Sequence, residues 1–202
     1  MKILIIGGKG TIGKKVSAHF EKKHEVIIGG RKSGDVILDI VDSSSIGKAF
    51  EQIGNVDAIV CIAGEAKWDA FEALSEEDFH IGLNSKLMGQ VNLVRIGQNY
   101  LNKGGSFTLS TGILADHPVA MTTSAAMVNG GIHSFAKAVA LELKNEQRIN
   151  VVSSGLVEDA VEIYEDYFPG HNPIPMNKVV NGYVKSVQGK ETGKIIRMYD
   201  NS

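Results

Sequence analysis

The chain of 202 residues contains a single cysteine, Cys61, which lies within an apolar stretch. It therefore cannot form an internal disulfide, and a lone thiol of this kind is typical of proteins from reducing compartments. We expect a cytoplasmic protein, and no metal site is predicted.

Excess charge of one sign and long apolar runs are also missing. The net charge is −2, whereas a dedicated nucleic-acid binder usually carries a basic surplus on one face. No apolar run approaches the ~20 residues of a membrane-spanning helix, and the N-terminus enters a strand pattern without signal-peptide features. Neither a nucleic-acid partner nor a membrane partner is expected.

Linker composition is absent as well. The 23 glycines stand singly or in pairs between periodic segments, with no low-complexity tract or block of charge. This length and pattern predict one α/β domain over residues 1–202.

What the sequence does contain is a strand, a glycine turn and a helix at its start. Residues 2–6 are an apolar run, as expected of a parallel strand buried on both faces. Residues 7–13, GGKGTIG, follow at once, and residues 14–23 continue with helical spacing. Glycines in this context allow a tight turn and close approach of the backbone to a pyrophosphate. The stretch predicts a dinucleotide-binding turn.

The end of the second predicted strand, residues 25–30, favours NADP over NAD. An acid at this place binds the free 2′-hydroxyl of the adenosine ribose, whereas an arginine accommodates a 2′-phosphate. Arg31, Lys32 and Ser33 occupy it, and Lys9 adds a further positive charge. Because a guanidinium pairs well with phosphate oxygens, we expect NADP, with an ordinary solvated turn as the alternative.

The remaining periodicity predicts a doubly wound Rossmann-type domain with a parallel sheet of about seven strands flanked by helices. Residues 1–64 form its mononucleotide-binding half, and about 156–190 form a lid that carries Tyr164 and Tyr167. Further strands are expected at 35–40, 57–62, 106–110, 150–153 and 194–198, and helices from 43 to 53, from 75 to 100 and from 124 to 144. Asp42 or Ser43 can cap the first of these helices, and residues 75–78 resemble a capping box at the start of the second.

The order of these motifs resembles the short-chain dehydrogenase/reductase family along nearly the whole chain. Residues 6–13 are similar to its Thr-Gly-x-x-x-Gly-x-Gly turn, Asp39-Ile40 to its Asp-Val pair at the adenine, residues 61–64 to its Asn-Asn-Ala-Gly, and residues 153–157 to its Pro-Gly segment at the nicotinamide. With the charges above, the resemblance implies cofactor contacts at Gly7, Lys9, Gly10, Thr11, Ile12, Gly13, Arg31, Ser33, Asp39, Ile40, Ala63, Gly64, Gly155 and Val157.

The catalytic pair of the family is replaced in this chain. The family uses Tyr-x-x-x-Lys, in which the tyrosine exchanges a proton with the substrate and the lysine holds the nicotinamide ribose. Alignment on Phe135 and residues 140–143 places Ala125 at the tyrosine and Asn129 at the lysine. Alanine has no proton to give, and asparagine has no charge.

Ser110 and Asn84 are the remaining catalytic candidates implied by the resemblance. Ser110 and Thr111 are expected as oxyanion-type donors after the fifth strand, and Asn84 stands where the family has a helix asparagine. A histidine such as His133 can titrate near neutral pH, but such a residue is more often at a helix surface or interface. Residues 122–124 are more often helix caps than ligands, and the lid tyrosines are more often packing groups than proton donors.

Two functions therefore stay open. The family favours an NADP(H)-dependent oxidoreductase acting on an unknown small carbonyl or alcohol, because the cofactor itself supplies the hydride chemistry. The missing pair favours a non-catalytic NADP(H)-binding sensor or scaffold. The resemblance also implies a homodimer or homotetramer formed through the two long helices.

Overall fold

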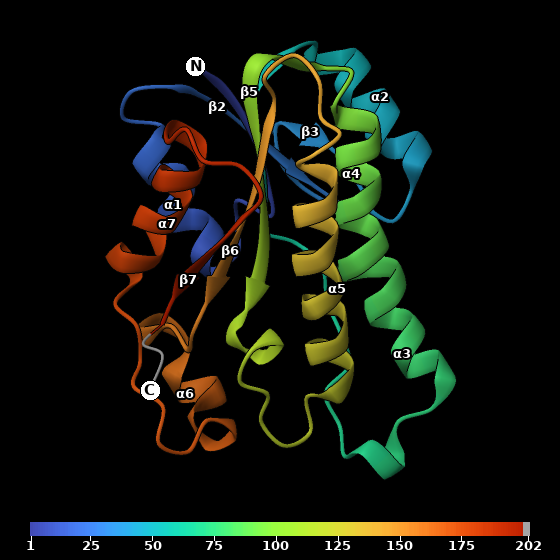
Figure 1. Cartoon of the computed structure of the whole chain (residues 1–202), viewed down its shortest axis with the longest axis vertical. Coiled ribbons are helices and arrows are strands. Elements are labelled where there is room, and N and C mark those ends of the chain that lie inside the picture. The colour runs from blue at the N-terminus through green and yellow to red at the C-terminus, as the bar shows by residue number, and fades with distance from the viewer. Residues whose placement is uncertain (200–202) are drawn as a thin grey trace.

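A seven-stranded parallel sheet forms the centre of the computed structural model, which describes residues 1–199 (Figure 1). The strands lie in the order β3-β2-β1-β4-β5-β6-β7, and each neighbouring pair runs parallel. They are β1 (Lys2–Ile6), β2 (Glu25–Gly30), β3 (Val36–Ile37), β4 (Val56–Cys61), β5 (Leu101–Gly112), β6 (Arg148–Ser154) and β7 (Lys194–Met198). The strand order reverses between β1 and β4, where doubly wound sheets open a ligand crevice at the carboxyl ends of the strands. The predicted fold class is confirmed.

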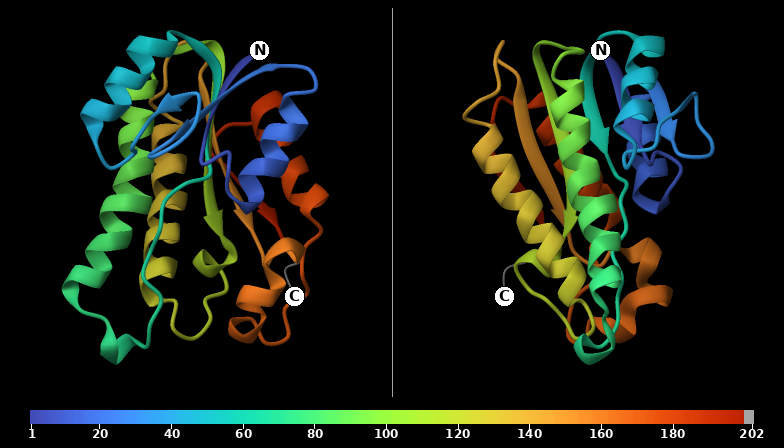
Figure 2. Two further views of the ribbon diagram at one scale, coloured as in Figure 1. Left: turned by 180° about the vertical axis from the view of Figure 1, so that it is seen from behind. Right: turned by 90° about the vertical axis from the view of Figure 1, so that its right-hand side faces the viewer.

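Helices cover both faces of the sheet, which explains why β1 is apolar from Ile3 to Ile6 (Figures 1 and 2). Ile3 and Ile5 pack into the core beneath α1 (Thr11–Phe20) and α7 (Met176–Gln188). Leu4 and Ile6 point the other way, into the core beneath α2 (Ser43–Ile53), α4 (Gly89–Gly97) and α5 (Thr123–Val139). Alternate residues of a strand face opposite sides, so a doubly covered strand needs apolar side chains at every position.

Side-chain caps fix the starts of two helices. The Ser75 hydroxyl accepts from the Asp78 amide at 3.2 Å, and the Asp78 carboxylate accepts from the Ser75 amide at 3.0 Å, at the start of α3 (Glu76–Gly82). Asp42 caps α2 by accepting from the Ser44 amide at 2.8 Å. Both predicted caps are confirmed.

The N-terminus of α5 differs from the prediction. Thr122 precedes the helix, but its hydroxyl donates to the Val119 carbonyl at 2.6 Å and caps no helical amide. The helix also ends at Val139 rather than at residue 144, because Leu141 and Glu142 turn back in short three-residue turns.

The long helix predicted from residue 75 to 100 contains a change of winding. A π-helical segment, Leu83–Met88, joins α3 to α4, and the Gly89 amide donates to the Asn84 carbonyl five residues back. Such wide turns alter which side chains face the neighbouring sheet, and they occur frequently at functional sites.

The structure divides the predicted lid of residues 156–190. Its first part crosses the carboxyl edge of the sheet through α6 (Val161–Tyr164) and two 3₁₀ turns, Glu158–Ala160 and Glu165–Tyr167. Its second part, α7, belongs to the core, because Val179 and Tyr183 are fully buried against the sheet. Below, "the lid" means residues 156–175. Within residues 1–199, no helix combines the length and hydropathy required to cross a bilayer.

Candidate functional site

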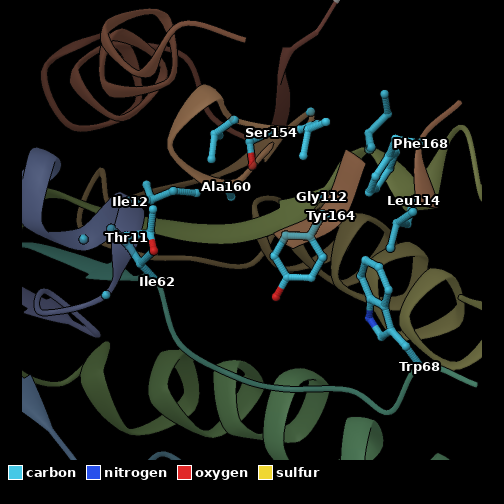
Figure 3. A pocket seen from close by; sticks show the side chains of 16 residues that line it. Thr11, Ile12, Ile62, Trp68, Gly112, Leu114, Ser154, Ala160, Tyr164 and Phe168 are labelled. Carbon is cyan, nitrogen blue, oxygen red and sulfur yellow. The ribbon is translucent and has the colours of Figure 1, made fainter. Parts of the chain in front are cut away.

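Two cavities lie along the carboxyl edge of the sheet and share Ile62, at the end of β4. The lid cavity, of about 350 Å³, extends from the glycine turn to the lid (Figure 3). The Arg31 cavity, of about 360 Å³, extends from the glycine turn towards β2 and β3. Together they form an elongated groove at the switch point of the sheet, a shape suited to a dinucleotide.

The glycine turn is built from positions that admit no side chain. A Cβ on Gly13 would lie 2.1 Å from the Gly7 carbonyl oxygen, and a Cβ on Gly7 would lie 2.5 Å from the Ile62 carbonyl oxygen. Gly7 also has φ +80°, a conformation that disfavours other residues. Gly10 is different: its nearest obstacle is 3.4 Å away, and it lines the lid cavity. The turn thus packs tightly inward and leaves bare backbone on the side that faces the groove.

The N-terminus of α1 is open to an anion. Gly10 stands at the N-cap with no side-chain hydrogen bond, and the first turn contains no acidic residue. Thr11, Ile12 and Gly13 line the lid cavity, so the unpaired amides of this turn lie beside it. Such amides and the helix dipole stabilise phosphate oxygens, and these residues therefore fit a pyrophosphate.

Every predicted cofactor residue except Lys9 and Ser33 lines one of the two cavities. Lys9 and Ser33 are exposed outside both. The Arg31 guanidinium lies 3.8 Å from the Glu65 carboxylate, with 59% and 66% of the two side chains exposed. This pair spans one side of the Arg31 cavity and is weak, since solvent screens it.

Ser110, expected as a donor at the site, is not among the residues that line the two cavities. Its hydroxyl is buried 2.8 Å from the phenol oxygen of Tyr183 on α7, where burial raises the pKa of that phenol. The next residue, Thr111, points to the other face, with its hydroxyl 2.9 Å from Nε2 of His133 on α5. Asn84 is exposed on the π-helical segment and lines neither cavity.

The helix α5 carries no proton donor into the groove. Ala125, Asn129 and His133 lie one turn apart on its buried side, and none of them lines a cavity. Desolvation lowers the pKa of His133 and favours its neutral form. Within residues 1–199, the buried Asn129 Oδ1 and Ser124 Oγ atoms have no hydrogen-bond partner.

Aromatic side chains close the far end of the lid cavity. Trp68, from the loop after β4, has ring-centroid distances of 5.5 Å to Tyr164, 5.4 Å to Tyr167 and 6.3 Å to Phe168. Figure 3 shows the Tyr164 hydroxyl directed into the space between Trp68 and the glycine turn. Trp68 was not among the predicted site residues, although it is the sole tryptophan and lies in a loop that follows a buried strand.

Acidic and metal-ligating groups are sparse around this groove. Across residues 1–199, no cluster of three or more histidine, cysteine, aspartate or glutamate side chains is placed to hold a metal ion.

Glu65 and Ser85 also line the Arg31 cavity, although neither was predicted from the sequence, because neither belongs to a recognisable motif.

Comparison with known proteins places this groove in a family context. Residues 17–180 match the family described as enoyl-(acyl carrier protein) reductase. The chain is 25% identical over 159 residues to oxidoreductase UcpA of Escherichia coli K12, a match that covers 74% of this chain and 60% of UcpA. It thus spans less than two thirds of this curated relative.

Solved structures agree along nearly the whole chain. Protein lin1944 from Listeria innocua is 45% identical, with a TM-score of 0.97 over 98% of this chain and all of that one. A small-chain dehydrogenase in complex with NADPH is 26% identical, with a TM-score of 0.86 over 98% of this chain and 95% of that one. The chain belongs to the short-chain dehydrogenase/reductase family.

Proposed function

We propose that this protein is an NADP(H)-dependent oxidoreductase of the short-chain dehydrogenase/reductase type. It would act on a small carbonyl or alcohol with a degenerate active site, in which Ala125 and Asn129 stand in place of the family's tyrosine and lysine. The observation that carries the proposal is the groove of two cavities joined at Ile62, with a glycine turn and an open helix N-terminus at its centre. The similar small-chain dehydrogenase with bound NADPH supports it.

NADP is proposed over NAD because the Arg31 cavity offers a guanidinium at its rim. An arginine there can donate two parallel hydrogen bonds to the oxygens of a 2′-phosphate, after leaving its exposed contact with Glu65. Asp39 also lines this cavity, but its carboxylate accepts from the Val41 amide at 3.0 Å and is engaged by its own turn. The positive group is therefore the freer of the two to meet the ribose.

The chain's own residues would bind the cofactor and enclose the substrate rather than transfer protons to it. When bound, the nicotinamide supplies the hydride. The amides of α1 hold phosphate oxygens, Trp68 and Tyr164 exclude water from the lid cavity, and the Lys15–Asp159 ion pair at 3.5 Å joins α1 to the lid. The apolar lining favours a substrate with an apolar body.

A second candidate is a non-catalytic NADP(H)-binding sensor or scaffold. The burial of Ala125 and Asn129, and the absence of either from the cavity lining, favour it. Loss of a general acid typically costs 10²- to 10⁴-fold in rate, which leaves slow turnover feasible. Subunit association through α4 and α5, as a homodimer or homotetramer, is part of either proposal.

Trp68 provides the test, because the only tryptophan of the chain lines the lid cavity. NADPH is expected to quench its emission in a saturable titration. A screen of aldehydes and ketones for NADPH consumption then separates the enzyme from the sensor, which binds without turnover. If neither NADPH nor NADH binds at millimolar concentration, both proposals fail.

A further inference from the structure

Lys86 holds an unusual place beside the groove. It lies in the π-helical segment, and its stem packs directly on Gly64: a Cβ on Gly64 would be 2.8 Å from the Lys86 Cα and 3.2 Å from its Cγ. Its neighbour Ser85 lines the Arg31 cavity and accepts from the Glu65 amide at 3.2 Å. The lysine is therefore fixed against the loop after β4 that forms the wall of the groove.

Contacts place this lysine near the end of β4, because it packs on Gly64 and interacts electrostatically with Cys61, the last residue of that strand. One turn later, the Gln90 side chain is fully buried and bonds both the amide and the carbonyl of Ser110, near the end of β5. Gly64 follows the end of β4. Lys86 thus lines neither cavity itself but lies directly behind Gly64, two residues after Ile62, where the two cavities meet.

The ammonium of Lys86 lacks a counter-charge. Within residues 1–199, its side chain has no ion pair and no hydrogen bond, although the residue is partly buried. Desolvation lowers its pKa, and the one group that acts on it electrostatically is the Cys61 thiol. Burial raises the pKa of that thiol to about 11, so it is neutral near pH 7. A shielded cation without a partner is costly unless a ligand provides one.

Among residues 1–199, Arg31 is the only lysine or arginine that lines either of the two cavities, and it stands at the adenosine end. On α5, Asn129 supplies no charge, and its buried Oδ1 atom is unpartnered.

We propose that Lys86 is the residue that orients the cofactor, donating from the α3–α4 side to the ribose hydroxyls on the nicotinamide half of the dinucleotide. This inference rests on the proposed function. Lys86, on the π-helical segment, would thus supply the positive charge that the family's lysine supplies from the helix where this chain has Asn129. The amides of α1 already provide donors for the pyrophosphate, which leaves the nicotinamide ribose without a positively charged donor in the lining of the lid cavity.

The test compares NADPH with 2′,5′-ADP, which has the phosphorylated adenosine but no nicotinamide ribose. Lys86→Met is expected to weaken NADPH binding about 10- to 100-fold, the range of a lost hydrogen bond from a charged donor, and to leave 2′,5′-ADP binding within about twofold. Lys86→Arg retains the charge and is expected to bind NADPH more tightly than Lys86→Met. Lys103→Met is the matched control, because Lys103 is 73% exposed and pairs with Glu146.

Stability gives an independent readout. Without ligand, Lys86→Met is expected to melt at or above the wild-type temperature, because an unpaired shielded charge is removed, while its stabilisation by NADPH shrinks. Lys86→Gln serves as a second neutral variant if the methionine variant does not fold.

Two results would overturn the inference while wild-type NADPH binding upholds the proposed function. One is wild-type NADPH affinity in the neutral variants, and the other is equal weakening of NADPH and 2′,5′-ADP. Failure of the wild-type protein to bind NADPH would instead overturn the proposed function itself, and this inference with it.

Discussion

Replacement of Gly13 by alanine should destabilise the whole fold. The added Cβ would lie 2.1 Å from the Gly7 carbonyl oxygen and 2.8 Å from the Gly8 Cα. Both obstacles are backbone atoms of the turn, so no change of side-chain rotamer relieves the overlap. Overpacking usually costs 1–3 kcal/mol, and an overlap with rigid backbone belongs at the upper end, at about 3 kcal/mol. For a chain of this size that corresponds to a melting temperature lower by about 6–12 °C.

Two other glycines provide matched controls for this prediction. Gly47, inside α2, has no atom within 4 Å of an added Cβ, so Gly47→Ala should raise stability by about 0.5–1 kcal/mol through helix propensity. Gly10→Ala should fold normally but weaken NADPH binding, because its Cβ enters the lid cavity. Circular dichroism melts and urea titrations measure all three. A Gly13→Ala protein that melts with the wild type would refute the reasoning about backbone contact.

Three further predictions concern single side chains. Asp116 accepts two bonds from Arg197, at 2.9 and 3.0 Å, which lower its folded-state pKa to about 2. The ionised carboxylate therefore contributes about 1 kcal/mol to the free energy of unfolding, a figure discounted for partial exposure. This contribution is present above pH ~4 and is lost as the pH falls towards 2. Urea titrations should show the loss in the wild type but not in Asp116→Asn. Glu65→Gln should release Arg31 and tighten NADPH binding about two- to threefold with NADH unchanged, and equal gains for both cofactors would contradict the role given to Arg31. Ser110→Ala should cost about 1 kcal/mol, from its lost bond to the α7 tyrosine, without altering NADPH affinity or any turnover; a selective loss of turnover would return this serine to the active site.

The contact between the lid and the loop after β4 could not be predicted from local sequence patterns. Tyr164 and Tyr167 were expected in a covering segment, but nothing near Trp68 in the sequence indicates that the two segments meet. They are about 100 residues apart in the chain, and the parallel sheet brings them together by placing both at the carboxyl edge (Figure 3). Contacts between loops depend on strand order, which local periodicity does not encode.

The sequence by itself determined the parts of this protein that depend on near neighbours. Apolar runs specified the strands, Ser75 and Asp42 specified helix starts, and the spacing of Gly7 and Gly13 specified a turn that only glycine can form. Each of these is a property of a few consecutive residues. The strand bounds were less exact, because β3 covers only Val36–Ile37 of the predicted 35–40 and β5 begins at Leu101 rather than at residue 106.

Only the tertiary structure decided which side chains reach the groove. Ser110 and Thr111 are both polar and neither lines a cavity, because successive strand residues face opposite sides: Ser110 meets Tyr183 of α7, and Thr111 meets His133 of α5. The π-helical turn likewise leaves Asn84 exposed and sets Lys86 against Gly64. A sequence does not show whether a lysine such as Lys86 has a counter-charge, because that depends on the side chains of every segment that packs around it.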